Sequence, residues 1–228
     1  GRAQFAIVPV ENSTEGAVNR TLDLLLTTPL KVIAEISIPV QHHLLTPSGT
    51  LDGVVRIYSH PQTFGQCMNW LNQNVPMLER VTVSSNAEAA RLASTDPTSA
   101  AIAGENAAQR YGLKLPAQHL EDTPQNRTRF LVRGQQTTRP TGRDKTSLIL
   151  SVPNKAGAMY EMLAPLAQHG VSMTRFESRP ARMGSGWDYT FYVDVEGHEA
   201  DSKVTAALGA LRQVCAFFKS LGSYPMQG

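Results

Sequence analysis

Short apolar runs that lead directly into polar, helix-starting residues recur in this sequence, and they restrict its fold more than any other feature. Three such units are Phe5–Val10 before Glu11–Glu15, Val54–Tyr58 before Ser59–Gln62, and Val81–Val83 before Ser84–Glu88. The pairs with the spacing of a capping box are Asn12 with Glu15, Ser59 with Gln62, and Ser85 with Glu88. A fourth run, Ala100–Ala103, precedes a helix expected to end at Gly112. Strands that alternate with helices predict an α/β domain.

A polar segment, Gly134–Asp144, is typical of a linker. Beyond it, the pattern restarts as strand, helix, two strands, helix and strand. The expected strands are Thr146–Val152, Val171–Glu177, Trp187–Val195 and Val214–Lys219, the helices are Ala158–His169 and Ala200–Arg212, and a turn covers Arg179–Gly186. Pro165 should perturb the first of these helices. The βαββαβ order predicts a ferredoxin-like unit.

Composition argues against several classes of partner. The 21 basic and 19 acidic residues leave a net charge of +2, so no nucleic acid and no anionic membrane surface is expected. The sequence has no apolar run long enough for a membrane span, no P-loop and no Gly-x-Gly-x-x-Gly turn. No cysteine and histidine cluster has the spacing of a zinc site, so no metal is expected. Cys67 and Cys215 fall in different predicted domains, which favours buried thiols of a cytoplasmic protein.

The junctions between strands and helices form the first candidate site. A helix start presents unpaired N–H groups and the positive end of the helix dipole, so it can bind a carboxylate. The alternative is that Asn12, Ser59 and Ser85 only cap their helices. Glu11 directly follows a strand, where it is either a general acid or the partner of an arginine.

The second junction carries the more specific signal. Pro61 suits the first helical turn, where its missing N–H costs little. Gln62 and Gln66 lie one turn apart, so both amides project from one face and can hold a carboxylate or carbonyl group. That face can equally be a solvated one, and an isolated histidine such as His60 is more often structural than catalytic.

The segment Asn126–Phe130 places a hydroxyl, two guanidiniums and an aromatic ring within five residues. Arginines bind carboxylates through two parallel hydrogen bonds, and a hydroxyl beside cationic groups can donate or relay a proton. The tripeptide Thr128–Phe130 recurs as Thr174–Phe176, and composition does not decide which copy is chemically active. In the second predicted domain, Gly157 permits close approach of a ligand to the loop Asn154–Gly157. The alternative for that loop, and for Glu177–Pro180, is an ordinary turn and strand end.

Together these motifs resemble prephenate dehydratase with a C-terminal ACT regulatory domain. The segments that carry the resemblance, in the order of the family, are Val8–Ser13, Ser59–Gln62, Asn126–Phe130, Gly157–Met159 and Glu177–Pro180. The resemblance implies an α/β fold in which a two-lobed, periplasmic-binding-protein-like catalytic domain precedes a ferredoxin-like ACT domain. The expected boundaries are 1–134 for the dehydratase domain, 135–145 for the linker and 146–228 for the ACT domain. The family begins with a glycine-rich strand, loop and helix that this sequence lacks, so the first lobe is expected to be incomplete.

The resemblance also implies a reaction. Prephenate loses its ring carboxylate and its hydroxyl to give phenylpyruvate, CO2 and water, without a metal or an organic cofactor. The catalytic threonine of the family maps to Thr128, whereas Thr174 is expected to be structural. The implied catalytic residues are Thr128, Arg129 and Glu11, and the implied substrate-binding residues are Asn12, Ser13, Ser59, His60, Gln62, Gln66, Ser84 and Phe130. In this interpretation Thr128 helps the hydroxyl to leave, Glu11 resupplies the proton and Arg129 binds a substrate carboxylate.

The ACT domain implies inhibition by L-phenylalanine bound at an interface in a homodimer or homotetramer. The implied ligand residues are Asn154, Gly157, Ala158, Met159, Glu177, Ser178, Arg179 and Pro180. Met159 stands where the family has leucine, and it conserves volume with more flexibility. Two alternatives remain open, namely an arogenate dehydratase, which shares these motifs, and a non-catalytic amino-acid sensor.

Overall fold

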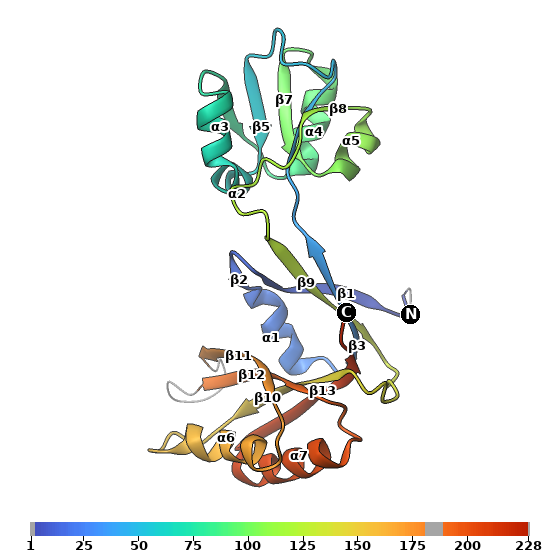
Figure 1. The fold of residues 1–228 in the computed structure, drawn as a ribbon, viewed down its shortest axis with the longest axis vertical. Coiled ribbons are helices and arrows are strands. Elements are labelled where there is room, and N and C mark those ends of the chain that lie inside the picture. The colour runs from blue at the N-terminus through green and yellow to red at the C-terminus, as the bar shows by residue number, and fades with distance from the viewer. Residues whose placement is uncertain (1–2, 181–188, 228) are drawn as a thin grey trace. The chain divides into compact units, whose positions relative to one another are not determined.

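The computed structural model of the chain describes residues 3–180 and 189–227 (Figure 1). The chain divides into two compact units. The inserted unit comprises residues 39–127, and the discontinuous unit comprises residues 1–38 together with 128–228. Each unit is described by itself.

The inserted unit is built on a five-stranded sheet with strand order β6-β5-β7-β4-β8. Its strands are β4 (His43–Thr46), β5 (Arg56–Ser59), β6 (Glu79–Thr82), β7 (Ser99–Ala103) and β8 (Lys114–Ala117). Strand β5 pairs in parallel with both β6 and β7, whereas β4 is antiparallel to β7 and β8. The parallel strands and their connecting helices confirm the expected α/β class.

Helices cover both faces of this sheet. They are α2 (Pro61–Gln66), α3 (Met68–Asn74), α4 (Asn86–Thr95) and α5 (Glu105–Tyr111). Because successive strand residues point to opposite faces, Ile57 and Ile102 pack with the α2 and α3 residues, whereas Ala101 and Ala103 pack with α4 and α5. Helix α5 ends at Gly112, whose positive φ of 66° closes the helix as expected.

The discontinuous unit contains two four-stranded sheets. Its N-terminal sheet has the order β2-β1-β9-β3. The elements are β1 (Ala6–Asn12), β2 (Gly16–Ala17), β3 (Lys31–Pro39) and β9 (Arg127–Gly134), with helix α1 (Asn19–Thr27) between β2 and β3. Strands β1 and β9 are antiparallel, with Asn12 opposite Thr128 and Glu11 opposite Arg129.

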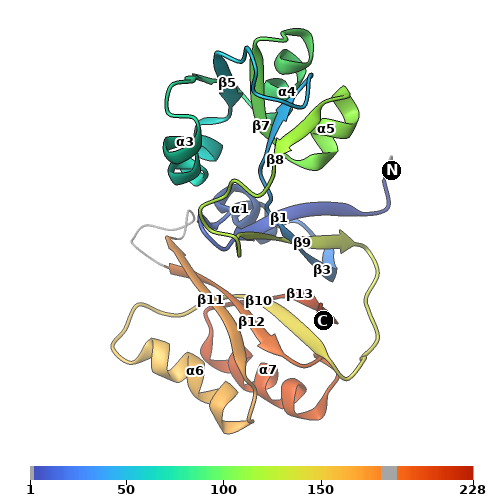
Figure 2. The ribbon, with the colours of Figure 1, turned by 45° about the horizontal axis from the view of Figure 1, so that its top comes forward.

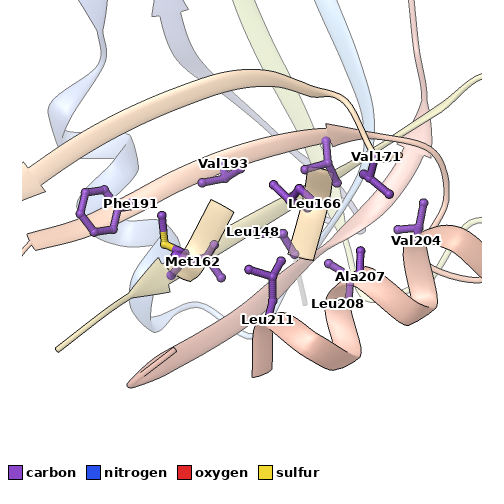
Figure 3. Close-up of a cluster of buried hydrophobic side chains, with 12 residues drawn as sticks. Leu148, Met162, Leu166, Val171, Phe191, Val193, Val204, Ala207, Leu208 and Leu211 are labelled. Atoms are coloured by element: carbon purple, nitrogen blue, oxygen red, sulfur yellow. The ribbon is translucent and has the colours of Figure 1, made fainter. Parts of the chain in front are cut away.

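The second sheet confirms the ferredoxin-like prediction, since it has the order β11-β12-β10-β13 with antiparallel pairs. Its elements are β10 (Asp144–Ser151), α6 (Ala158–Gln168), β11 (Met173–Pro180), β12 (Tyr189–Glu196), α7 (Ser202–Val214) and β13 (Phe217–Pro225). Helices α6 and α7 cover one face of the sheet (Figure 2). Figure 3 shows the core between these helices and the sheet, where Leu148, Val193 and Leu211 are at most 1% exposed.

The opposite face of the ferredoxin-like sheet packs against α1 and the N-terminal sheet. Ile149 and Tyr224 from the ferredoxin-like sheet share one buried cluster with Leu22 of α1 and Leu131 of β9. The Tyr192 hydroxyl donates a 2.8 Å hydrogen bond to the Leu22 carbonyl, and burial raises the pKa of Tyr192 to about 12. The two sheets therefore form one continuous body.

Several local predictions were wrong. No helix starts at Glu11–Glu15, because this segment ends β1 and turns into β2, and α1 begins only at Asn19. His60, not Ser59, is the N-cap of α2, although Pro61 does lie in the first turn. Ser85 caps α4 as predicted, accepting a hydrogen bond from the Glu88 N–H at 3.1 Å.

The C-terminal strands also differ from the prediction. Strand β11 continues through Pro180, and residues 181–186 of the predicted turn lie outside the described residues. The last strand begins at Phe217, three residues beyond Val214, and runs on to Pro225. Helix α6 includes Pro165 without ending there.

Candidate functional site

Asn12 and Thr128 form the polar pair at the end of strands β1 and β9. The Asn12 side-chain N–H donates a 2.9 Å hydrogen bond to the Thr128 hydroxyl. The orientation of this amide is fixed, because its oxygen accepts hydrogen bonds from the backbone N–H groups of Thr14 and Glu15 at 2.9 and 3.0 Å. The Thr128 hydroxyl therefore acts as an acceptor toward Asn12, which leaves its own proton to donate to a ligand.

Arg129 lies on the opposite face of β9 from Thr128, because adjacent strand residues alternate. Its guanidinium contacts the Glu35 carboxylate at 2.8 Å, the Asp194 carboxylate at 2.7 Å and the Tyr224 hydroxyl at 3.0 Å. Burial alone would lower the pKa of this guanidinium, but its neighbours, Asp194 first, outweigh burial and raise that pKa above its ordinary value. The sequence predicted that this guanidinium binds a substrate carboxylate, but in the structure it binds carboxylates of the protein.

Glu11 follows the second of the two interpretations offered for it, since it pairs with arginines. Its carboxylate accepts a 2.8 Å hydrogen bond from Arg175 Nε and lies 3.7 Å from Arg129 Nη1. Arg175 belongs to the second copy of the Thr-Arg-Phe tripeptide, so this copy serves an internal ion pair. Ser13 is exposed in the turn after β1, and the half-buried Phe130 shares the face of Thr128.

In the inserted unit, Ser59 is fully buried, and Asn86 organises the junction around it. The Asn86 amide oxygen accepts hydrogen bonds from the Ser59 hydroxyl at 3.2 Å and the His60 N–H at 3.1 Å. Its amide nitrogen donates to the Thr63 hydroxyl at 2.9 Å. The starts of α2 and α4 are therefore joined beside the carboxyl ends of β5 and β6, the edge where α/β sheets usually bind ligands.

The remaining predicted residues of this unit lie close to that edge. His60 Nδ1 accepts a 3.3 Å hydrogen bond from the Gln62 N–H, and the Gln62 side chain is exposed. Gln66 Oε1 lies 2.7 Å from His42 Nε2, and the His42 N–H donates to the Glu121 carboxylate at 2.9 Å. Ser84 is exposed before the α4 cap. The predicted catalytic residues belong to the discontinuous unit, whereas these five substrate candidates, Ser59, His60, Gln62, Gln66 and Ser84, belong to the inserted unit.

The loop before α6 borders a pocket of about 390 Å³ in the ferredoxin-like domain. Its lining residues are Val152, Pro153, Asn154, Lys155, Gly157, Ala158, Met159, Tyr189 and Phe191. Gly157 has a φ of 81°, a conformation that favours glycine, and it is the N-cap of α6. The Tyr189 and Phe191 rings stack with centroids 6.5 Å apart. The structure therefore brings Asn154, Gly157, Ala158 and Met159 together around an apolar cavity.

Glu177–Pro180 belong to the edge strand β11, where Ser178 lies opposite Phe191 and Pro180 lies opposite Tyr189 in the neighbouring strand. The described lining of the pocket includes none of these four residues. Arg179 contacts Asp23 of α1 at 3.2 Å, so this side chain ties the edge strand to the helix beneath the sheet. The ligand-binding roles of Glu177, Ser178 and Pro180 stay predictions.

Within 3–180 and 189–227, no group of three or more histidine, cysteine, aspartate or glutamate side chains could hold a metal ion. None of the helices in these ranges is both long enough and apolar enough to cross a membrane.

Sequence reasoning missed Asn86, Glu35 and Asp194. Asn86 follows the Ser84-Ser85 pair at the start of a helix, where a second amide is easily overlooked. Asp194 had a readable signal, since it is a single carboxylate within the apolar run Phe191–Val195. A charge in such a run is rarely buried without a partner.

Two family models match the chain. The family model described as Prephenate dehydratase matches residues 1–138, and the model described as ACT domain matches residues 146–213. A bifunctional chorismate mutase/prephenate dehydratase of Neisseria gonorrhoeae is 48% identical over 227 residues, covering 98% of this chain. The chain spans 62% of the length of that relative.

Two solved structures are similar over the whole chain. A prephenate dehydratase from Arthrobacter aurescens in complex with L-Phe has 34% identity and a TM-score of 0.87, covering 99% of this chain and 76% of that one. A structure described as a novel type of quorum-quenching acylase has 32% identity and a TM-score of 0.89, covering 100% of this chain and 83% of that one.

Proposed function

The chain belongs to the prephenate dehydratase family and carries an ACT domain, and on this premise we propose that it is a prephenate dehydratase of phenylalanine biosynthesis. The proposed domains are the dehydratase part at 1–134, a linker at 135–145 and the ACT domain at 146–228. The observation that carries the activity is the Asn12–Thr128 hydrogen bond, because it leaves the Thr128 hydroxyl as a proton donor.

The proposed reaction is a decarboxylating elimination. The bond between the ring and its carboxylate breaks and releases CO2, and its electron pair enters the ring as the ring becomes aromatic. The C4–oxygen bond breaks at the other end, and the departing oxygen takes a proton and leaves as water. Thr128 donates the hydrogen bond or proton to that oxygen and regains a proton from a neighbouring group or solvent. A positioned general acid contributes roughly 10²–10⁴-fold.

The other residues take supporting parts in this proposal. Asn12 orients Thr128, and Phe130 shares its face of β9. Arg129 and Glu11, whose charges are paired with protein groups, hold the strands rather than the substrate. The substrate-binding roles of Ser13, Ser59, His60, Gln62, Gln66 and Ser84 stay predictions.

For regulation, we propose that L-phenylalanine binds the pocket beside Asn154 and Met159 and inhibits the enzyme. An apolar cavity with stacked aromatic rings suits a phenyl group. Inhibition requires that the ligand prefer an inactive arrangement, and the size of that preference sets the coupling. Titration calorimetry that compares L-phenylalanine with L-alanine tests binding at this pocket.

We also propose that the protein acts in the cytoplasm as a homodimer or homotetramer.

The test of the activity is the absorbance of phenylpyruvate formed from prephenate. Thr128→Ala is expected to lower kcat by about 10²–10⁴-fold, and Thr128→Ser should retain most of it. The matched control is Thr174→Ala, in the second copy of the tripeptide, where the hydroxyl donates only to the Asp194 carbonyl at 3.3 Å. A Thr128→Ala protein as active as the Thr174→Ala protein would refute the role of Thr128.

Two further substrates decide between alternatives. Arogenate differs from prephenate by an ammonium in place of a ketone, so parallel assays measure the preference directly. The similarity to the structure described as an acylase makes acyl-group hydrolysis the second candidate function. An N-acyl substrate that is cleaved while prephenate is not would favour that candidate.

A further inference from the structure

A buried aspartate of the ACT sheet holds the strand that carries Thr128. Asp194 lies in β12 with 4% exposure. Its carboxylate contacts Arg129 Nη1 at 2.7 Å and accepts a 2.5 Å hydrogen bond from the Ser147 hydroxyl. Ser147 also bonds the Tyr224 hydroxyl at 2.7 Å, so the carboxylate is fixed within its own sheet.

Arg129 joins this fixed carboxylate to the N-terminal sheet. The same guanidinium donates to Glu35 of β3 and to Tyr224 of β13. Glu35 is held in turn by Lys145 of β10, with nitrogen–oxygen distances of 2.9 and 3.0 Å. One guanidinium therefore connects strands β3 and β9 of the N-terminal sheet with β12 and β13 of the ACT sheet.

Breaking this connection is costly in free energy. Removing one partner of a buried ion pair leaves an uncompensated charge, which costs more than the loss of an exposed pair. Thr128 is covalently adjacent to Arg129 on β9, so a displacement of the guanidinium moves the peptide that carries the hydroxyl. Misplacing a catalytic group by about 1 Å can cost about 10²-fold in rate.

We propose that Asp194 is a positioning residue for Thr128, acting from the ACT domain through Arg129. This inference rests on the proposed dehydratase function. It gives the ACT sheet a role in catalysis that is separate from ligand binding, because Asp194 does not line the pocket beside Gly157. The carboxylate thus anchors, from the ACT sheet, the strand on which Asn12 orients the Thr128 hydroxyl.

The test compares Asp194→Asn with Asp144→Asn. Asp144 is a matched control, because it is 3% exposed in the same sheet and its carboxylate binds Thr141 and Gly142 within its own turn. Asp194→Asn is expected to lower kcat for prephenate by about 10- to 100-fold, with KM within about twofold, while Asp144→Asn keeps kcat within about twofold. Hydrogen exchange of residues 127–134 should accelerate only in Asp194→Asn.

The outcomes of this test distinguish a failure of the positioning role from a failure of the proposed dehydratase function. Unchanged exchange of residues 127–134 in Asp194→Asn overturns the positioning role, whether or not the protein is active. Faster exchange with unchanged kcat leaves Asp194 as a structural anchor and also overturns it. A wild-type protein inactive on prephenate refutes the proposed function, and the exchange data then decide by themselves whether Asp194 holds the strand.

Two further variants guard against misfolding. Asp194→Glu retains the charge and should recover part of the lost kcat, which a purely steric defect would not. Tyr224→Phe removes one hydroxyl from the same guanidinium and keeps the ring in the core. If Asp194→Asn does not fold, Tyr224→Phe should show a smaller loss of kcat and a smaller acceleration of hydrogen exchange in residues 127–134. Wild-type values of both quantities in Tyr224→Phe would overturn the proposal.

Discussion

The Asn12 amide and the Thr128 hydroxyl meet across antiparallel strands in a 2.9 Å hydrogen bond whose direction the following turn determines. Two backbone N–H groups bind the amide oxygen, so only the nitrogen of Asn12 can face Thr128. In this geometry the Thr128 hydroxyl accepts from Asn12, so it can donate its own proton to a ligand. It also makes the direction of the hydrogen bond open to experiment.

Asn12→Asp should reverse that direction. The aspartate carboxylate has the shape of the asparagine amide but has no N–H to donate, so it accepts a hydrogen bond from the Thr128 hydroxyl. The hydroxyl proton is then no longer available to the substrate. We expect kcat to fall by about 10²–10⁴-fold, the range of a lost general acid, with the fold intact. Steady-state kinetics and circular dichroism measure the two quantities.

The control for this charge change is Asn106→Asp, an exposed position in the first turn of α5. It adds the same charge without touching Thr128 and should leave kcat unchanged. Equal kinetics for Asn12→Asp and wild type would show that the direction of the hydrogen bond is irrelevant to turnover.

Gly157→Ala tests the backbone conformation at the proposed L-phenylalanine pocket. A Cβ at this position meets no atom within 4 Å, so only the φ of 81° opposes it. A left-handed conformation costs an L-residue about 1–2 kcal/mol, so we expect this loss of stability and weaker binding of L-phenylalanine. Urea unfolding and titration calorimetry give the two values.

Gly209→Ala, in the same domain, should change stability in the opposite direction. Gly209 lies within helix α7 with open space around its Cβ position, so alanine should stabilise the protein by about 0.5–1 kcal/mol. Similar changes in stability for Gly157→Ala and Gly209→Ala would contradict the assigned conformation of the loop.

The sequence predicted what depends on neighbouring residues. Ser85 and Glu88 lie in one helical turn, and their capping interaction formed as expected. Asn12 and Glu15 have the same spacing, yet β1 continues through Asn12 because β9, more than one hundred residues away, supplies its hydrogen-bonding partner. Local propensity is a weak preference that tertiary pairing overrides.

The same reason limits what could be predicted of the site. Thr128 was selected through the family resemblance, and the ACT pocket gathers the loop residues that the motif named. The partners of Arg129 could not be inferred, because Glu35, Asp194 and Tyr224 come from three other strands. Only their convergence in the fold shows that this guanidinium already has carboxylate partners.

Gly222→Ala tests the close contact between the two sheets of the discontinuous unit. A Cβ on Gly222 of β13 would lie 2.7 Å from the backbone oxygen of Val32 in β3, and the glycine has a φ of 124°. Backbone atoms cannot yield as a flexible side chain can, so the sheets must separate. Overpacking of this kind costs about 1–3 kcal/mol, which urea unfolding can measure.

Gly170→Ala separates the clash from the backbone strain. Gly170 also has a positive φ, of 61°, but a Cβ there meets nothing within 4 Å. It should therefore show the conformational cost alone. If Gly222→Ala is no more destabilising than Gly170→Ala, the close packing of β13 on β3 is not a constraint.

The buried thiol of Cys67 should make stability fall at alkaline pH. Desolvation, with smaller contributions from Asp122 and Glu121, raises the pKa of Cys67 to about 12 in the folded protein. An exposed thiol in the unfolded chain titrates near its ordinary pKa of about 8.5. Between these values the unfolded state has lost a proton that the folded state keeps, so stability is complete below about pH 8.5 and is lost as pH rises toward 12.

Urea unfolding gives the free energy of unfolding of wild type and Cys67→Ala between pH 7.5 and 10.5. The difference between the slopes of these two free energies against pH measures the contribution of Cys67. The wild type should lose at most about 1.4 kcal/mol more per pH unit above the unfolded pKa than Cys67→Ala does. Cys215→Ala is the matched comparison, because burial also raises the pKa of Cys215, to about 11. Up to pH 10.5 both folded thiols keep the proton that the unfolded chain loses, so both variants should depart from the wild-type slope by the same amount. Parallel curves for wild type and Cys67→Ala would show that the folded protein admits solvent to this thiol.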